Sequence, residues 1–403
     1  MTGVSQIREA SVRPALTSCG AGFRLPAVTA IRALLATVLL TVPACAEPMI
    51  GVPPQPADEF QADPPAVAVT TFIDGLDTPW SLVFAADGRG FVSERPGRIR
   101  MIENGKALPI GFVEVASGGE GGLMGLALDP RFPSAPYLYA MHTHAEGDKL
   151  SNRVIRLIVD GYSVRFDRVI LGGIPGGRIH DGGRIAFGPD GYLYIGTGET
   201  GRSELAQDMN SLGGKILRVT AEGGIPPDNP FRGSPIWSLG HRNVQGLAWE
   251  PRTGQLFDSE HGPSGELGVH AWDEVNVIAP GANYGWPKVV GAVRQAGLTD
   301  PVVAWPGSSV PPSGIAFWKG DLYVATLRSQ ALIRVHLEQQ PNGWRATGVY
   351  RWFAFNHNDG RFGRLRDVTV GPDGALYALT SNRDGRGRPH EGDDRILRIV
   401  NTR

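Results

Sequence analysis

One pattern of apolar and polar positions recurs six times along this chain. In each copy an apolar stretch with strand-like alternation runs into a turn, often of the Asp-Gly type, and a second apolar stretch follows. An Asp-Gly turn between two apolar runs is the strongest short-range signal of a β-hairpin. The copies begin near the following residues: Ser81, Gly125, Arg184, Gly246, Gly314 and Asp367.

A third apolar stretch, with a basic residue inside it, closes several of the copies. It is found at residues 99–102, 216–219, 332–335 and 396–399. Six repeats of one such unit predict an all-β fold, a six-bladed β-propeller with one four-stranded sheet per blade. The strand expected near residues 67–72 would complete the last blade and close the ring.

Residues 1–47 are typical of a targeting segment and not of the folded domain. Their apolar run is too short to span a bilayer comfortably, and it ends in a lipobox-like sequence that would leave Cys45 as a lipid-carrying N-terminus. Cleavage by ordinary signal peptidase would instead give a plain secreted protein. We expect an extracytoplasmic protein, secreted or held in the cell envelope, and favour the lipid anchor. The proline-rich residues 48–67 are expected to form an extended tether to the propeller domain, residues 68–403.

Composition narrows the class of partner. The chain has 403 residues and a formal net charge of −1, which disfavours nucleic acid because phosphate binding needs a clustered positive field. Its 55 glycines and 32 prolines fit a turn-rich β fold. The only cysteines are Cys19 and Cys45, so we predict no disulfide, thiol nucleophile or thiolate metal site in the folded domain. A monomer or homodimer is expected.

Residues 239–287 are unusually rich in Gly, Pro, His, Arg, Asn and aromatic residues. Glycine and proline at this density indicate backbone held in special turns. Arginine, carboxylates and aromatic rings among such turns are the groups that hold a planar anion and a hard cation. We interpret the stretch as one wall of a cofactor site at the mouth of the central channel, where loops of all blades converge.

His180 lies in a glycine-rich approach to the third repeat, and Glu199 follows on the same predicted hairpin. A hairpin of that length can bring the carboxylate back beside the imidazole. A carboxylate on one ring nitrogen fixes the tautomer and raises the basicity of the other nitrogen, as a general base requires. The spacing also fits a histidine that only hydrogen-bonds a neighbouring loop.

Four arginines stand in loops that enter or leave strands of different repeats. Guanidinium groups gathered in one pocket repel each other unless a polycarboxylate or phosphate fills it. These arginines therefore either surround a common anion or are scattered over solvated rims. They are Arg242 (followed by Asn243), Arg328, Arg364 and Arg366.

Three short segments suggest oxygen ligands for a hard cation: Gly262-Pro263, Asp273-Glu274 and the turn at Asn283-Tyr284. Backbone carbonyls in irregular turns, together with carboxylates, suit Ca²⁺. The sequence has no HExxH motif and no clustered cysteines, so it gives no indication of a zinc site. The sequence also has no GxGxxG between a strand and a helix and no GxSxG elbow, which disfavours a nicotinamide-binding Rossmann domain and a nucleophile elbow.

Taken together, these segments resemble the soluble pyrroloquinoline quinone (PQQ)-dependent sugar dehydrogenases, which include the aldose sugar dehydrogenases. The likeness extends over about residues 75–400. Each matching motif is only modestly specific for this family. Their shared order along the six repeats makes the resemblance strong. The matching phrases are Thr78-Pro79-Trp80, Ser93 to Arg98, Gly119 to Gly125, His180 to Arg184, Gly240 to Gly246, Glu260 to Pro263, Asp273-Glu274, Asn283 to Pro287 and Arg364 to Asp367.

The resemblance implies PQQ and Ca²⁺ at the channel mouth, an aldose sugar as substrate and an external electron acceptor. It implies that His180 takes the proton of the sugar C1 hydroxyl while hydride leaves C1 for the quinone, and that Glu199 orients this histidine. Arg242 and Asn243 match residues that contact the quinone oxygens.

The family's remaining cofactor contacts also have counterparts here. Arg328 stands where the family often has a lysine on the cofactor, and Arg364 and Arg366 match its carboxylate-binding arginines. Cationic partners are what a planar quinone with three carboxylates needs.

The resemblance further implies two calcium sites. The carbonyls of Gly262 and Pro263 match ligands of the Ca²⁺ that also binds PQQ. Glu274 and the carbonyl of Tyr284 resemble a second, structural Ca²⁺ site.

Three features depart from the best-studied members. Glu120, which we also place at the cofactor, stands where some members carry a glutamine near cofactor and substrate. Ile179 stands where the glucose enzymes have a sugar-binding aspartate, and the segment 264–272 is longer than usual. A carboxylate at Glu120 beside an anionic cofactor is expected only if it faces a cation or the sugar hydroxyls.

The sequence therefore predicts a PQQ- and Ca²⁺-dependent aldose dehydrogenase that oxidises the C1 hydroxyl of a sugar to a lactone. Two alternatives belong to other classes. One is a metal-dependent, lactonase-like propeller hydrolase with a divalent ion held by carboxylates in the channel. The other is a cofactor-less propeller that binds glycans or protein.

Overall fold

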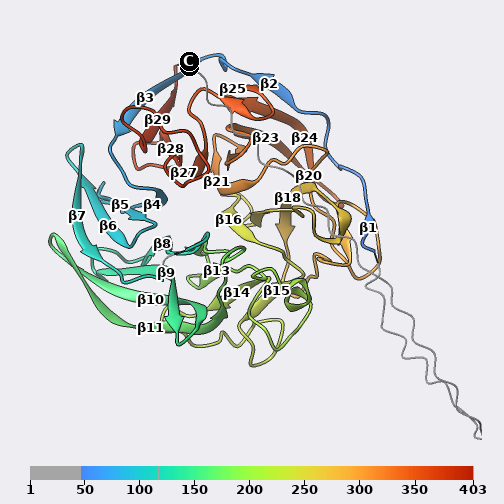
Figure 1. The fold of residues 1–403 in the computed structure, drawn as a ribbon, viewed down its shortest axis with the longest axis horizontal. Coiled ribbons are helices and arrows are strands. Elements are labelled where there is room, and N and C mark those ends of the chain that lie inside the picture. The colour runs from blue at the N-terminus through green and yellow to red at the C-terminus, as the bar shows by residue number, and fades with distance from the viewer. Residues whose placement is uncertain (1–46, 117, 403) are drawn as a thin grey trace, which may run out of the picture. The chain divides into compact units, whose positions relative to one another are not determined.

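Six β-sheets are arranged in a ring, five of four strands and one in which an extra strand joins the four antiparallel strands (Figure 1). The computed structural model describes residues 47–116 and 118–402, so residues 1–46 of the predicted targeting segment, Cys45 included, lie outside the described residues. The ring confirms the predicted six-bladed propeller. Besides strands, the described residues form two short 3₁₀ turns, η1 (Ser203–Ala206) and η2 (Glu266–Gly268). None of the helices within these ranges is long and apolar enough to cross a membrane.

The first five blades each use four strands in chain order, and the first strands of neighbouring blades contact one another around the channel. Blade 1 consists of β4 (Pro79–Phe84), β5 (Gly90–Glu94), β6 (Arg98–Glu103) and β7 (Lys106–Phe112). Blade 2 consists of β8 (Leu123–Leu128), β9 (Tyr137–Glu146), β10 (Lys149–Asp160) and β11 (Ser163–Pro175). Blade 3 consists of β12 (Ile185–Phe187), β13 (Leu193–Gly196), β14 (Lys215–Val219) and β15 (Ile236–Leu239).

The remaining blades complete the ring. Blade 4 consists of β16 (Val244–Trp249), β17 (Leu256–Glu260), β18 (Ala271–Ile278) and β20 (Val303–Pro306). Blade 5 consists of β21 (Pro312–Trp318), β22 (Asp321–Thr326), β23 (Leu332–Gln340) and β24 (Gly343–Trp352). Blade 6 consists of β27 (Leu365–Val370), β28 (Leu376–Thr380), β29 (Ile396–Asn401) and the N-terminal β3 (Val67–Ile73). A small hairpin, β25 (Ala354–Asn356) and β26 (Asp359–Gly360), lies between blades 5 and 6 in the chain.

The predicted repeats coincide with the blades. Each repeat begins in or immediately before an innermost strand, and the basic-apolar stretches are the third strands β6, β14, β23 and β29. β3 pairs antiparallel with β29, which confirms that the N-terminal strand closes the last blade.

Glycine at the start of several repeats lets the innermost strands of neighbouring blades approach closely. The N–H of Gly125 in blade 2 donates to the carbonyl of Gly183 at the entry of blade 3, at 3.0 Å. A Cβ on Gly125 would lie 2.3 Å from that oxygen, and a Cβ on Gly246 would lie 2.5 Å from the carbonyl oxygen of Ser313. Any larger residue at these positions would push the blades apart at the channel.

The functional loops lie at one end of the channel. Because the strands of a blade are antiparallel, the loop that enters its first strand and the loop that joins its second and third strands emerge at the same edge. Most predicted site residues stand in these two kinds of loop, so the fold gathers them on one face. The exceptions are Arg366 on β27, Glu274 on β18 and Tyr284 in the connection that follows β18.

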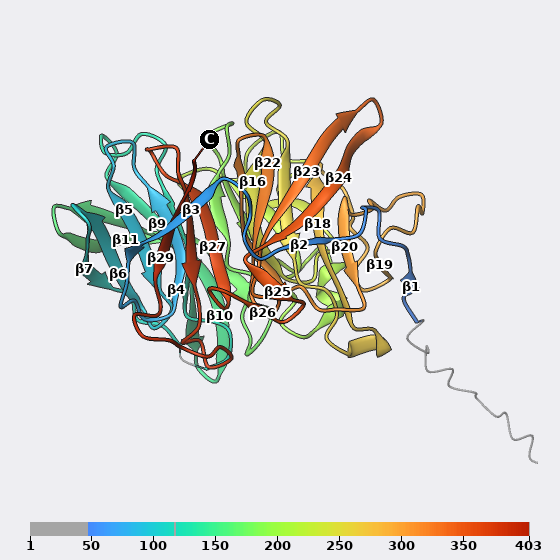
Figure 2. The same ribbon diagram turned by 90° about the horizontal axis from the view of Figure 1, so that it is seen from above.

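The segment predicted as a tether lies against the propeller, which corrects that prediction. β1 (Met49–Ile50) pairs in parallel with β19 (Val289–Val290), and β2 (Glu59–Gln61) pairs in parallel with β24 (Figures 1 and 2). Its prolines do keep the segment extended. However, exposed strand edges carry unpaired N–H and C=O groups, and this segment satisfies part of them.

Asp58 anchors this segment to blades 4 and 5. Its carboxylate forms an ion pair with Arg351 on β24 and accepts the indole N–H of Trp305 on β20 at 3.2 Å. Arg351 is only 2% exposed, so the N-terminal segment supplies the counter-ion of a buried cation.

Replacing Asp58 by alanine is expected to lower the free energy of unfolding by about 3–5 kcal/mol, because Arg351 would be left buried without its counter-ion. Urea unfolding at neutral pH measures the change. The exposed neighbour Glu59→Ala is the control and should stay within about 0.5 kcal/mol of the wild type. Equal stabilities of Asp58→Ala and the wild type would show that the segment does not stabilise the ring.

Candidate active site

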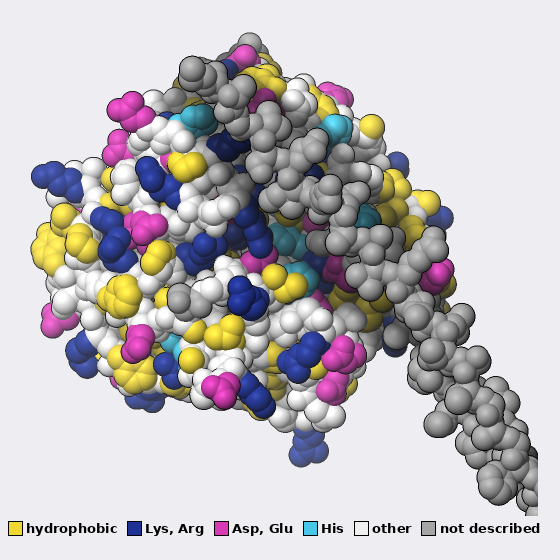
Figure 3. All heavy atoms as spheres, viewed as in Figure 1, with side chains coloured by type: hydrophobic (Ala, Val, Ile, Leu, Met, Phe, Trp, Pro, Cys, Tyr) yellow, Lys and Arg dark blue, Asp and Glu magenta, His cyan; other side chains and the backbone are white. Residues whose placement is uncertain are grey.

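A cavity of about 370 Å³ opens where the loops of five blades meet. This volume lies within the roughly 300–1,000 Å³ typical of ligand pockets. Arginine and lysine side chains gather near the middle of the face seen in Figure 3, next to histidine side chains. Six predicted site residues line the cavity: Glu120, His180, Arg242, Gly262, Arg328 and Arg364.

Three side chains in this cavity form a continuous hydrogen-bonded chain. Nδ1 of His180 bonds the carboxylate of Glu199, and Nε2 of His180 faces Nη2 of Arg242 at 3.0 Å. A guanidinium can only donate, so Nε2 must carry the lone pair and Nδ1 the proton. The predicted pairing of His180 with Glu199 is therefore present, in the tautomer that places the basic lone pair on Nε2, where Arg242 donates to it.

The backbone holds His180 in an unusual conformation. Its φ is +56°, a left-handed value that costs a β-carbon-bearing residue roughly 1–3 kcal/mol. Two contacts fix the surrounding loop: Asp181 accepts the N–H of Gly177 and the side-chain amide of Asn152, both at 2.9 Å. This imposed conformation aims the imidazole between Glu199 and Arg242.

Glu120 connects the loop of His180 to blade 6. One carboxylate oxygen accepts the N–H of His180 at 3.0 Å, and the other accepts Nη1 of Arg386 at 2.8 Å. Burial alone would raise the pKa of Glu120, but the amide and the guanidinium more than offset burial and lower the pKa to about 2. The carboxylate thus faces a cation, as expected from the sequence.

Arg242 is buried, and every nitrogen of its guanidinium has a partner. Nε donates to Glu266 at 2.6 Å, Nη2 also pairs with Glu266, and Nη1 donates to the carbonyl of His261 at 3.2 Å. Glu266 belongs to the long segment between β17 and β18, where sequence reasoning had assigned no partner for Arg242.

Asn243 is buried beneath the cavity and positions a second histidine. Its Oδ1 accepts the N–H of Gly182 at 2.9 Å, while its Nδ2 donates to Nδ1 of His261 at 3.3 Å. Burial, with Arg242 and Arg366 nearby, lowers the pKa of His261 to about 3. His261 is therefore neutral, and its proton is on Nε2, which has no partner among the described residues.

The remaining predicted arginines differ in their surroundings. Arg364 is paired with Asp384 through Nε at 3.0 Å and Nη2 at 2.8 Å, so it already has an anionic partner. Arg328 is exposed at the rim, with no ion pair within the described ranges.

Arg366 lies deeper, in an adjoining cavity of about 40 Å³. Within the part of the chain that the structure describes, it has no carboxylate partner, and its Nη1 donates to Gln245 at 3.0 Å. Burial lowers the pKa of Arg366 to about 9. A buried, unpaired guanidinium at the base of a cavity favours an anionic guest.

The residues predicted to bind calcium border a separate void of about 20 Å³. Glu274 lies opposite Glu260 in the pairing of β17 with β18, and both side chains line the void together with Tyr284, Gly262 and Pro263. Burial, and the adjacent Glu260, raise the pKa of Glu274 well above its ordinary value. Two carboxylates that face each other, one buried (Glu260) and one half-buried (Glu274), are a site that a cation would stabilise.

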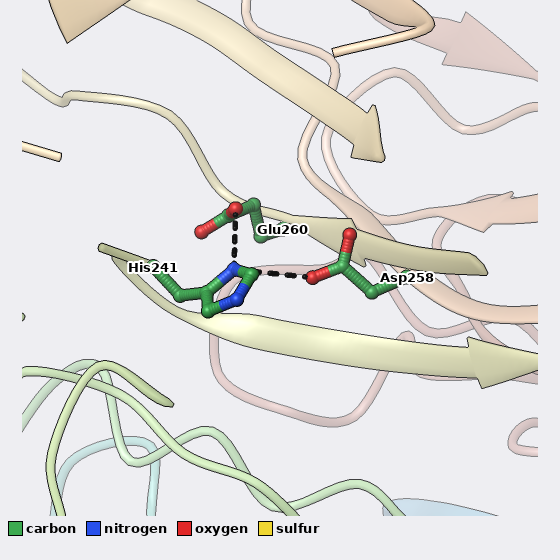
Figure 4. Close-up of side chains that lie close together, drawn as sticks. All are labelled: His241, Asp258 and Glu260. Atoms are coloured by element: carbon green, nitrogen blue, oxygen red, sulfur yellow. Dashed lines mark hydrogen bonds and ion pairs between the residues drawn. The ribbon is translucent and has the colours of Figure 1, made fainter. Parts of the chain in front are cut away.

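Behind this void lies a buried cluster of His241, Asp258 and Glu260 (Figure 4). Nδ1 of His241 lies 3.1 Å from Glu260 and 3.4 Å from Asp258, and its ring stacks on Tyr284 with 4.6 Å between centroids. One nitrogen of the imidazole thus contacts both carboxylates, and the ring supports the turn that carries Tyr284.

Sequence reasoning missed three residues of the site: His261, Glu266 and Arg386. His261 stands inside a phrase that was singled out, but only its neighbours received roles. Arg386 and Glu266 lie in long loops, and their partners are distant in sequence. The acidic residue at position 120 implied that a cationic side chain faces it. The arginine-rich segment 383–388 was the sequence signal that could have identified this partner.

Comparison with known proteins identifies the family of this chain. The Glucose / Sorbosone dehydrogenase family matches residues 76–397 of this chain. The aldose sugar dehydrogenase YliI of Escherichia coli is 33% identical over 364 residues, which cover 80% of this chain and 92% of that protein. Quinoprotein glucose dehydrogenase B of Acinetobacter calcoaceticus is 32% identical over 303 residues, which cover 66% of this chain and 61% of that protein.

Solved structures agree with this match. The PQQ-bound aldose sugar dehydrogenase of Streptomyces coelicolor is 42% identical, with a TM-score of 0.75, over 83% of this chain and 99% of that chain. The apo form of the soluble aldose sugar dehydrogenase of Escherichia coli is 30% identical, with a TM-score of 0.71, over 83% of this chain and 99% of that chain.

Replacing Glu120 by glutamine is expected to destabilise the protein by roughly 1–2 kcal/mol at pH 7, because the ion pair with Arg386 is lost. The folded pKa of Glu120, about 2, lies below its ordinary value of 4.5, so this stabilisation is complete above pH 4.5 and is lost as the pH falls toward 2. Urea unfolding of both proteins at several pH values measures the difference. A difference that stays constant down to pH 3 would contradict the assigned ionisation of Glu120.

Proposed function

Because the chain belongs to the Glucose / Sorbosone dehydrogenase family, we propose that it is a PQQ- and Ca²⁺-dependent aldose dehydrogenase. It oxidises the C1 hydroxyl of a sugar to the lactone and passes the electrons to an external acceptor. The observation that carries this proposal is the imidazole of His180, held by Glu199 with its basic nitrogen toward a cavity rich in guanidinium groups. We further propose an extracytoplasmic location, on the targeting pattern of the first residues.

His180 provides the base. Its Nε2 takes the proton of the C1 hydroxyl, and the carboxylate of Glu199 on Nδ1 stabilises the imidazolium that results. Both side chains are nearly buried, which strengthens this electrostatic support. The charge of Arg242 beside the imidazole favours the deprotonated oxygen of the substrate as the proton leaves.

The cavity fits PQQ in charge and in size. PQQ carries three carboxylates. Arg328 lines the cavity and Arg366 lines the adjoining one, and neither has a carboxylate partner among the described residues. Arg364 faces Asp384 already, so we assign it a smaller share of the binding energy. When bound, PQQ would accept the hydride that leaves C1.

Calcium fits at two places. The carbonyls of Gly262, which lines the cavity, and of Pro263 would hold a Ca²⁺ that also contacts the cofactor. Glu274, with the carbonyl of Tyr284, would hold the second ion in the neighbouring void, where Glu260 adds negative charge.

His180→Gln is expected to lose at least about 100-fold in kcat, since general-base catalysis typically contributes 10²–10⁴-fold. The assay is dye reduction with a panel of aldoses after loading with PQQ and Ca²⁺. The matched control is His336→Gln, an exposed histidine on β23 that should retain activity. Equal activity of His180→Gln and wild type would refute the assigned base. If the activity and the melting temperature of the wild type do not change when PQQ is added, the proposed function itself is refuted.

Glu274→Gln is expected to abolish part of the rise in melting temperature that Ca²⁺ produces. In the metal-free protein the same change should stabilise, because it removes a carboxyl whose pKa is raised by burial beside Glu260. A raised folded pKa means that metal-free wild type loses stability as the pH rises above 4.5, whereas Glu274→Gln should lose less. Scanning calorimetry with Ca²⁺ or a chelator measures both effects. An unchanged response to Ca²⁺ would remove Glu274 from the ligand set.

A further inference from the structure

We propose that Glu266 is a positioning residue that holds Arg242 against the basic nitrogen of His180 and so keeps that nitrogen covered until the site is loaded. The inference deepens the proposed function and rests on it for the role of His180. Glu266 itself touches neither Nε2 of His180 nor any predicted cofactor contact other than Arg242.

The hydrogen bonds determine where the guanidinium can go. The carboxylate of Glu266 pairs with two of the three guanidinium nitrogens of Arg242, with Nε at 2.6 Å and with Nη2. The remaining contacts are Nη1 with the carbonyl of His261 at 3.2 Å and Nη2 with Nε2 of His180 at 3.0 Å. Arg242 is therefore fixed from both sides, and only one of its contacts is to the base.

The local backbone is built to present Glu266. Between β17 and β18, a bridge between Ser264 and His270 closes a short loop. Leu267 at its tip has a φ of +58°, and the other carboxylate oxygen of Glu266 accepts the N–H of Ser264 at 2.8 Å. The carboxylate is thus anchored to its own loop before it reaches Arg242.

Charge favours the same arrangement. Arg242 is only 2% exposed, and among the described residues Glu266 is the one carboxylate with an ion pair to it. Burial raises the pKa of Glu266, but Arg242 more than offsets this and lowers it. At neutral pH the pair therefore combines a full anion with a full cation.

The consequence concerns the base. Nε2 of His180 has a single lone pair, which cannot accept a proton from a sugar hydroxyl while Arg242 donates to it. An oxygen acceptor in the cavity that draws Nη2 toward itself would uncover Nε2. Because Glu266 keeps hold of Nε, the guanidinium can turn without leaving the site.

The test uses Glu266→Ala, with Glu266→Gln as the conservative variant and His270→Ala as the matched control in the same loop. His270 is exposed and makes no contact with Arg242. The first readout needs no cofactor: diethylpyrocarbonate acylates imidazole nitrogens with a free lone pair, and peptide mass spectrometry, with His180→Gln as background, isolates the rate at His180. The second readout is kcat and KM of the enzyme loaded with PQQ and Ca²⁺.

We expect Glu266→Ala to raise the acylation rate of His180 several-fold in the unloaded protein and to lower kcat roughly 10- to 100-fold with little change in KM, as misplacement of a catalytic contact does. Glu266→Gln, whose amide oxygen still accepts from Nε, should stay within about 3-fold of wild type in both readouts. His270→Ala should match wild type.

Unchanged acylation and kcat in Glu266→Ala would overturn the inference, and so would equal effects in His270→Ala, which would indicate a role in loop structure alone. A wild type without PQQ-dependent activity, but with the acylation difference intact, would refute the proposed function and leave the contact of Glu266 with Arg242 standing.

Discussion

Closure of the ring is the constraint on which the site depends. The residues that line the cavity come from the loops of blades 2 to 6, and the fold alone fixes the distances between them. The ion pair of Glu120 with Arg386, at 2.8 Å, joins residues that are 266 positions apart. Blade 1 lies between their blades, so the pair exists only because β3 locks blade 6 through β29 and glycines let the innermost strands pack closely.

Most charges in the cavity are already compensated, and this decides which residues can select a ligand. Arg242 faces Glu266, Arg364 faces Asp384, and Arg386 faces Glu120. A paired cation offers little net attraction to a further anion, because the new contact competes with the existing one. Arg366 and Arg328 are different, since the described residues give them no carboxylate partner. Of the two, Arg366 is the more discriminating because it is buried, where electrostatic interactions are screened least.

Local signals in the sequence were sufficient for the blades and for the core of the site. The repeated hairpin phrase predicted six sheets, and the strand at residues 67–72 predicted ring closure. The pairing of His180 with Glu199 followed from one hairpin, β12 with β13, which places the loop entering one strand beside the loop leaving the next. These features depend on contacts between residues that are close in the sequence, and such contacts leave a local sequence pattern that can be recognised.

Contacts between distant segments could not be predicted in the same way. The prolines of residues 48–67 indicated an extended segment, but nothing in them indicated that Asp58 would meet Arg351 or that β2 would pair with β24. Arg386 and Glu266 escaped notice for the same reason, since each stands in a long loop and its partner belongs to another strand connection. Glu120 lies between these two cases, because the sequence indicated part of its contact but not the partner. Its charge required a cation, yet the sequence alone did not say which arginine would supply it.

Two acidic residues of the site, Glu120 and Glu266, follow one rule. Glu120 lies in the loop that enters blade 2, and Glu266 lies in the loop between β17 and β18. Each faces an arginine, so each adds a negative charge only where a positive charge cancels it. An uncompensated carboxylate would repel an anionic cofactor in a low-dielectric cavity. Neither carboxylate therefore leaves an uncompensated negative charge in the cavity, and both act on geometry: Glu120 fixes the amide of His180, and Glu266 fixes the guanidinium opposite its imidazole.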